Sequence, residues 1–149
     1  MKLEIGEKVI HKTHGAGIVV SIAEKTFNQD DGSIQFYILE IQDNGTTKKV
    51  FVPLDTANEK LRKPTTGLDR ARLISRLKGD APPLVVEHST WNRRYRDYME
   101  AVHSGEIEKI IEVYRTLQSL RTEKNLSFGE RKLQDQCKML IEAELEITL

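Results

Sequence analysis

The pattern of apolar and polar residues changes near residue 65. Before this point, short runs rich in β-branched and aromatic residues alternate with clusters of Asn, Asp and Gly. Such runs are typical of strands joined by tight antiparallel turns. The predicted strands lie at residues 9–10, 18–27, 36–41 and 49–53. Four or five short strands in about 60 residues predict a small, strongly bent sheet of SH3-like or Tudor-like form.

The second half of the chain has the spacing of amphipathic helices. Four segments carry apolar stripes, at Leu68, Ala71, Ile74 and Leu77; at Trp91, Tyr95, Tyr98, Met99 and Val102; at Ile107, Ile110, Ile111, Tyr114, Leu117 and Leu120; and at Leu133, Cys137, Leu140 and Ile141. Ser89 or Thr90 is expected to cap the second segment and Ser104 the third. Ser127 and Glu130 match a capping box, in which each side chain satisfies a backbone N–H of the other residue. This half is predicted to be a bundle of four or five helices.

The fold class is therefore α+β in two domains. Residues 1–63 are expected to form the small antiparallel β-barrel, and residues 64–149 the all-α bundle. A length of 149 residues leaves room for two small domains of this kind.

The charges of the chain are balanced, with 23 basic and 23 acidic residues and a formal net charge of zero. Neither half has an excess, because residues 1–63 hold nine of each sign and residues 64–149 hold fourteen of each. A protein that held DNA by bulk charge would be basic. Any contact with DNA is therefore local and weak, and it becomes useful when a second site brings the protein to the DNA. The charge balance thus favours a bridging protein.

The segment of residues 91–96 is the strongest candidate for such a local contact. It holds the only tryptophan, Trp91, together with Arg93, Arg94 and Arg96, and it contains no acidic residue. Guanidinium groups pair with phosphate oxygens, and an apolar ring can insert between unstacked bases. The alternative interpretation is an ordinary helix start in which Trp91 is the first core aromatic residue.

Residues typical of enzymes or metal sites are sparse. The single Cys137 excludes an internal disulfide, fits a reducing compartment, and lies on an apolar stripe that predicts a buried, inert thiol. His11 and His14 fall short of the four ligands of a structural zinc site. The glycine-rich segment 14–17 lies between strands, so it predicts a turn with positive φ rather than a phosphate-binding loop. We therefore expect no catalysis, metal or cofactor. We see neither a signal sequence nor an apolar run near 18 residues, so we expect a cytoplasmic protein.

Three aromatic residues in the first half raise the possibility of a cage for a methylated side chain. Such a cage needs several rings that converge on one spot. Phe36 and Tyr37 are adjacent on a strand and so point to opposite faces, which favours one core residue and one surface residue over a cage with Phe51.

Several motifs resemble the CarD/CdnL family of bacterial RNA polymerase-binding transcription factors, whose N-terminal domain is shared with transcription-repair coupling factor. In the first half the similar segments are residues 5–10, 14–17 and 51–57, and in the second half residues 91–95, 104–106, 112–117 and 126–131. The order of the motifs and the two-half layout also agree. A chain of 149 residues without helicase motifs differs from the coupling factor itself.

The resemblance implies a Tudor-like domain that binds a lobe of the polymerase β subunit, and a helical domain that contacts promoter DNA at the upstream edge of the melted bubble. It implies that Trp91 wedges into the distorted minor groove and that Arg93, Arg94 and Arg96 support the neighbouring backbone. On the polymerase side it implicates Lys25 and the position of Phe51, where another family member has arginine. The expected protein is a monomeric initiation regulator that associates with the nucleoid through polymerase.

A second hypothesis remains open beside this one. The small sheet could dock a partner strand along an exposed edge, as a protein-only adaptor, with Trp91 buried in the helical core. The fluorescence of the single tryptophan distinguishes the two hypotheses, because an exposed indole favours the DNA wedge.

Overall fold

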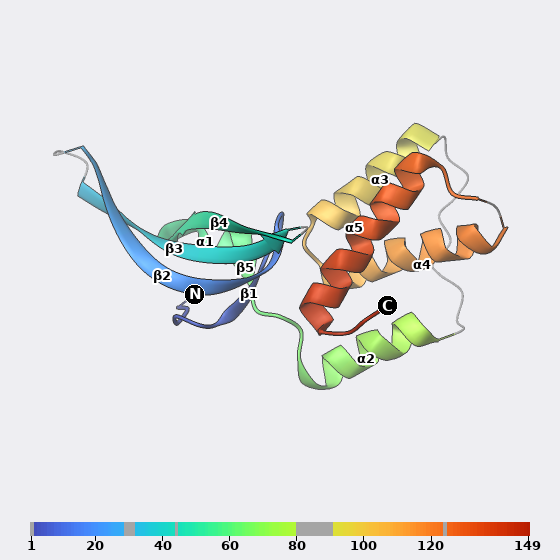
Figure 1. Ribbon diagram of the computed structural model, residues 1–149, viewed down its shortest axis with the longest axis horizontal. Coiled ribbons are helices and arrows are strands. Elements are labelled where there is room, and N and C mark those ends of the chain that lie inside the picture. Colours follow the sequence, from blue (N-terminus) through green and yellow to red (C-terminus); the bar gives the residue numbers. More distant parts are fainter. Residues whose placement is uncertain (1, 29–31, 44, 80–90, 124) are drawn as a thin grey trace. The chain divides into compact units, whose positions relative to one another are not determined.

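A computed structural model describes residues 2–28, 32–43, 45–79, 91–123 and 125–149. The chain divides into two compact units, Met1–Pro64 and Thr65–Leu149. The first unit is an antiparallel sheet and the second is helical, so the predicted α+β class is confirmed at this level (Figure 1).

The first unit is a curved sheet of five strands in the order β4-β3-β2-β1-β5. The strands are β1 (Lys8–His11), β2 (Gly15–Asn28), β3 (Gly32–Asp43), β4 (Thr46–Pro53) and β5 (Leu61–Arg62), with a 3-10 turn at Leu54–Thr56 and a short helix α1 (Ala57–Lys60) between the last two. Two of the strands, β2 and β3, are much longer than the short strands expected. Gly15 has a φ of 85°, as predicted for the turn between β1 and β2.

One face of this sheet holds the core of the unit. Val9, Val19, Leu39 and Val52 are almost completely buried there. Tyr37 lies on the same face, and its hydroxyl oxygen accepts a hydrogen bond from the backbone N–H of Leu3 at 3.1 Å. The period of two along each strand sends the neighbouring residues to the other face.

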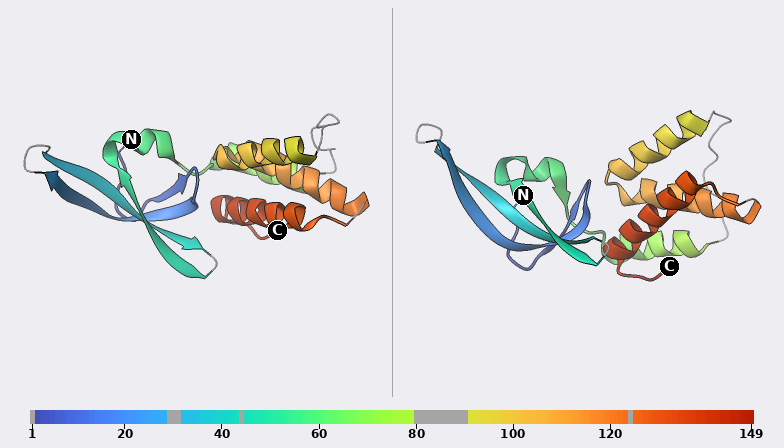
Figure 2. Two further views of the ribbon diagram at one scale, coloured as in Figure 1. Left: turned by 90° about the horizontal axis from the view of Figure 1, so that it is seen from above. Right: turned by 45° about the horizontal axis from the view of Figure 1, so that its top comes forward.

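The second unit contains four helices among its described residues: α2 (Gly67–Lys78), α3 (Trp91–His103), α4 (Ile107–Glu123) and α5 (Phe128–Leu145). In the left view of Figure 2, α2 and α3 overlap on one side of the unit and α5 lies on the other, and the right view shows that α2 and α3 are apart from each other. Their shared core includes Ile111, Leu117, Cys137 and Ile141, all of which are fully buried. Helices α3, α4 and α5 have the spacing of apolar residues that the sequence predicted.

The caps of the helices follow the sequence closely where they are described. Ser127 accepts a hydrogen bond from the backbone N–H of Glu130, and the Glu130 carboxylate accepts one from the N–H of Ser127, so the capping box is confirmed. The Ser104 hydroxyl accepts a hydrogen bond from the backbone N–H of Glu106, just before α4 begins. The expected cap at Ser89 or Thr90 lies outside the described residues.

The predicted apolar face of α2 is wrong in its first half, at Leu68 and Ala71, and confirmed in its second half, at Ile74 and Leu77. Leu68 is 90% exposed and Ala71 is also exposed, whereas the buried residue is Leu73, with Ile74 and Leu77 packed beside it. A strict three-residue repeat turns by about 60° around the helix at each step, because an α-helix has 3.6 residues per turn. The real stripe is Leu73, Ile74 and Leu77, which stays on one face.

Candidate functional site

The first turns of α3 bring together the basic residues of the segment 91–96. Trp91 is the first residue of α3, although its side chain lies outside the described part of the structure. Arg93 and Arg96 are exposed and Arg94 is half-buried. The first turn contains no acidic residue. Cations at a helix N-terminus oppose the helix dipole, typically by about 0.3–1 kcal/mol each. Helix stability therefore does not explain these arginines.

An apolar stripe runs along α3, and its described side chains become more exposed towards the N-terminus. Val102 is 2% exposed, Tyr98 is 4% exposed and Tyr95 is 41% exposed. Trp91 occupies the next position of this stripe, one turn beyond Tyr95, because residues four apart lie on the same face of a helix. By its position in the helix Trp91 belongs to this stripe, and it shares the first turns of α3 with the three arginines.

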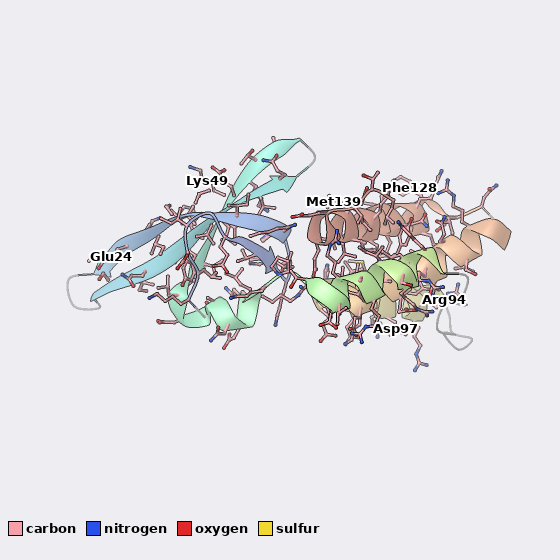
Figure 3. All side chains as sticks on the ribbon, turned by 90° about the horizontal axis from the view of Figure 1, so that it is seen from below. Glu24, Lys49, Arg94, Asp97, Phe128 and Met139 are labelled. Carbon is pink, nitrogen blue, oxygen red and sulfur yellow. The ribbon has the colours of Figure 1, made fainter. Side chains whose placement is uncertain are left out.

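The N-terminal turn of α5 adds an aromatic residue that the sequence interpretation did not single out. Phe128 is 75% exposed although it is large and apolar. It lies off the stripe that buries Leu133, Cys137 and Ile141. Figure 3 shows Phe128 and Arg94 towards the same end of the helical unit. An apolar side chain outside the helical period was the available signal, since such positions are normally polar.

Charged groups from both helices also meet at Tyr98. Burial raises the pKa of Tyr98, and the positive charge of Arg94 acts in the opposite direction, while Glu130 and Asp97 add to the rise. Arg94 on α3 and Glu130 in the first turn of α5 therefore lie near the same side chain.

The structure also brings together the two residues implicated on the sheet. The Nζ atom of Lys25, on β2, lies 4.9 Å from the ring centroid of Phe51, on β4. This distance is within the range of a cation–π interaction. Phe51 pairs with Ile38, and Lys25 pairs with Ile34, so all four residues share the face of the sheet opposite to the core.

This outer face, defined by Lys25, Ile34, Ile38 and Phe51, is unusually apolar for a solvent-facing surface. Phe51 is 46% exposed and Ile34 is 39% exposed. Exposed apolar side chains that gather on one face mark interaction surfaces more often than isolated ones do. Tyr37 points into the core, whereas Phe36 is on the outer face with Phe51, so the prediction that Phe36 and Tyr37 point to opposite faces is confirmed.

The histidines of the first unit have a structural role. His11 is 8% exposed, and its Nδ1 atom accepts hydrogen bonds from the backbone N–H groups of Thr13 at 3.0 Å and His14 at 3.2 Å. Burial, followed by the nearby positive charges of His14, Lys60 and Lys48, lowers the pKa of His11 to about 4. His11 is thus a neutral acceptor that holds the turn between β1 and β2.

The remaining chemical candidates show no reactive arrangement. Cys137 is fully buried in α5, and burial raises the pKa of its thiol to about 12, in agreement with an inert thiol. Within the described ranges, no cluster of three or more His, Cys, Asp or Glu side chains is arranged to hold a metal ion. Among the same residues, no helix is both long and apolar enough to cross a membrane.

Comparison with known families accounts for both units. Residues 73–149 match the family described as "CarD, C-terminal domain", and residues 3–65 match the "CarD-like/TRCF RID domain". The chain therefore belongs to the CarD family of transcription regulators, and the resemblance seen in the sequence is confirmed. The RID match implies an interaction with RNA polymerase in general terms.

A curated relative covers almost the whole chain. YdeB of Bacillus subtilis (strain 168), a protein whose name describes a transcription factor, is 27% identical over 146 residues. The alignment covers 97% of this chain and 90% of YdeB. Both units are therefore shared with a protein of similar length.

Proposed function

We propose that this protein regulates transcription initiation by joining RNA polymerase to the upstream edge of the promoter bubble. The sheet unit, as a Tudor-like domain, binds a lobe of the β subunit through its outer face. The helical unit contacts the DNA through Trp91, Arg93, Arg94 and Arg96. The observation that supports the proposal is the start of α3, where Trp91 is followed by exposed Arg93 and Arg96 and the first turn contains no acidic residue.

The wedge acts by a difference in affinity between two states of the promoter. Inserting an apolar ring into intact duplex requires a base step to unstack, at about a few kcal/mol. At the edge of an open bubble the bases are already unstacked, so Trp91 binds the open state better. Only this difference shifts the equilibrium between the states. A difference of about 1.4 kcal/mol shifts the open-to-closed ratio about tenfold.

The polymerase contact supplies the local concentration that a neutral chain lacks. A free protein with three arginines at its DNA contact binds weakly, with a salt slope near −0.9 for each phosphate neutralised. Attachment to polymerase makes the DNA contact intramolecular. The protein then acts as a monomer, in the cytoplasm and on the nucleoid, wherever polymerase holds a promoter. It needs no cofactor and performs no catalysis.

The first test is the lifetime of open complexes formed by the cognate polymerase. Wild-type protein is expected to lengthen the lifetime, and folded Trp91→Ala is expected to lose this effect while it still binds polymerase. Full activity of Trp91→Ala would exclude the wedge. Fluorescence quenching of the wild-type tryptophan provides a control, because the wedge requires an accessible indole.

The second test addresses the sheet. Lys25→Glu places a carboxylate against the Phe51 ring and reverses one charge of the outer face, so co-purification with polymerase should fall. Lys60→Glu is a matched control, since Lys60 is exposed on α1 and makes the same charge change. Equal co-purification of the two variants would remove the outer face from the polymerase contact.

A protein-only adaptor is the second candidate function, and the open edge of the sheet favours it. The eight-residue strand β4 (Thr46–Pro53) is an edge strand of the sheet. An extended partner segment could pair with it. In that case Trp91→Ala would leave open-complex lifetimes unchanged, and a Pro substitution in β4 would abolish partner binding.

A further inference from the structure

Lys25 and Phe51 meet on the outer face although they are not neighbours in the sheet. Strand β3 separates their strands, and their partners on β3, Ile34 and Ile38, are four positions apart along it. The side chain of Lys25 must therefore extend diagonally across β3 for its Nζ atom to lie 4.9 Å from the centroid of the Phe51 ring. The contact thus depends on one extended conformation of Lys25.

The ring of Phe51 supplies an energetic reason for this conformation. An ammonium group within about 6 Å of an aromatic centroid is attracted by the negative face of the ring. Lys25 forms no ion pair within the described part of the chain, so no carboxylate there competes with the ring. An extended lysine also lays its apolar stem on the surface beneath it. Both effects favour the conformation that reaches Phe51.

A held lysine binds a partner at a lower entropic cost than a free one. A surface lysine samples many rotamers, and its restriction on binding opposes association. The attraction to Phe51 restricts Lys25 before any partner arrives. Because Lys25 is exposed and Phe51 is 46% exposed, the ammonium group stays accessible to a partner. The outer face therefore presents a positive charge at a defined place within an apolar surface.

We propose that Phe51 is a positioning residue, which acts on the polymerase contact through Lys25 rather than by touching polymerase itself. It holds the Lys25 ammonium where a carboxylate of the partner can pair with it, while the apolar side chains around it exclude water. This inference rests on the proposed function, because it assigns roles within the contact between the outer face and polymerase. A Phe51 that merely packed against polymerase would contribute equally with and without Lys25.

The experiment is a double-mutant cycle, measured as the Kd of the full-length protein for the cognate polymerase. Phe51→Leu keeps an apolar side chain but removes the ring. It is expected to weaken binding about two- to fivefold, as for a cation–π contact at an exposed site. When Lys25→Gln is also present, Phe51→Leu should leave the Kd nearly unchanged. Phe51→Tyr, which keeps the face of the ring, should bind like the wild type.

Ile18→Ala is the matched control for the loss of apolar surface. Ile18 is 49% exposed and lies on the same side of the sheet, where it pairs with Glu40. Any weakening that it causes should be the same with and without Lys25→Gln.

NMR of the free protein tests the contact without polymerase. Protons held over the face of an aromatic ring resonate upfield. The Hε protons of Lys25 should therefore be shifted upfield in the wild type and in Phe51→Tyr. In Phe51→Leu they should return to the position of an ordinary exposed lysine.

Three results would overturn the proposal. Equal losses from Phe51→Leu with and without Lys25→Gln would show that Phe51 contacts polymerase directly. Lys25 Hε protons without an upfield shift, or binding by Phe51→Tyr as weak as that by Phe51→Leu, would show that the ring does not hold the ammonium group. If the wild type does not bind polymerase, the proposed function and this inference fall together, whereas binding without coupling refutes the inference alone.

Discussion

The end of α5 is held by a side chain from α2. The guanidinium of Arg70 donates two hydrogen bonds to the carbonyl oxygen of Leu145, from Nη2 at 2.6 Å and from Nε at 3.0 Å. Carbonyls in the last turn of a helix have no donor within the helix, and that end carries a partial negative charge. Arg70 therefore supplies both the missing donors and a compensating positive charge.

The Arg70→Ala variant removes both hydrogen bonds. A hydrogen bond to a charged group contributes about 1.5–3 kcal/mol, and water replaces part of this at a half-buried position. We expect the free energy of unfolding of the helical unit to fall by about 2–3 kcal/mol. Arg72→Ala is the matched control on the same helix. Its ion pair with Asp69 is exposed, at 70% and 69%, and such pairs contribute about 0.2–1 kcal/mol.

Denaturant unfolding followed by far-ultraviolet circular dichroism measures this difference, because nearly all of the helix lies in the second unit. The midpoint of Arg70→Ala should move to clearly lower denaturant, and that of Arg72→Ala should stay close to wild type. Equal midpoints for the two variants would refute the view that Arg70 secures the end of α5.

Two further predictions concern the sheet. A Cβ on Gly17 would lie 2.7 Å from Cγ1 of Ile41 and 3.1 Å from the carbonyl oxygen of Glu40. Gly17→Ala should therefore destabilise the sheet unit by about 1–3 kcal/mol in thermal unfolding. An unchanged melting temperature would show that the neighbouring strand moves aside at no cost. The pKa of His11 is about 4 in the folded protein against 6.5 for a free histidine. As the pH falls, the unfolded state therefore takes up the proton before the folded state does. The free energy of unfolding should fall between pH 6.5 and pH 4, by at most about 3 kcal/mol. His11→Asn should make the free energy of unfolding less dependent on pH in this range. His103→Gln, an exposed control, should leave that dependence unchanged. If the pH dependence persists in His11→Asn, other groups cause it.

Local patterns predicted much of the fold. The capping box of Ser127 and Glu130 depends on residues three apart, and the strands depend on alternation within a few residues. The first half of the α2 face was assigned incorrectly because its spacing fits two stripes, and only the packing of Leu73 against the other helices selects one. Local sequence carries no information on that packing.

The parts of the sites that depend on distant residues were harder to predict. Contact between Lys25 and Phe51 requires the register of β2 and β4 across β3, which lies between them. Arg70 and Leu145 are 75 residues apart. Phe128 was visible in the sequence, but its exposure follows only from the position of the α5 stripe.

The central claim is that one unit attaches the protein to polymerase while the other acts on the bubble. The most direct measurement is open-complex lifetime as a function of protein concentration for wild type, Lys25→Glu and Trp91→Ala. Attachment only raises local concentration, so Lys25→Glu should reach the wild-type lifetime at high concentration. Trp91→Ala should never reach it, because its difference in affinity between open and closed states is gone. Recovery of Trp91→Ala at high concentration, or a permanent defect in Lys25→Glu, would contradict the account.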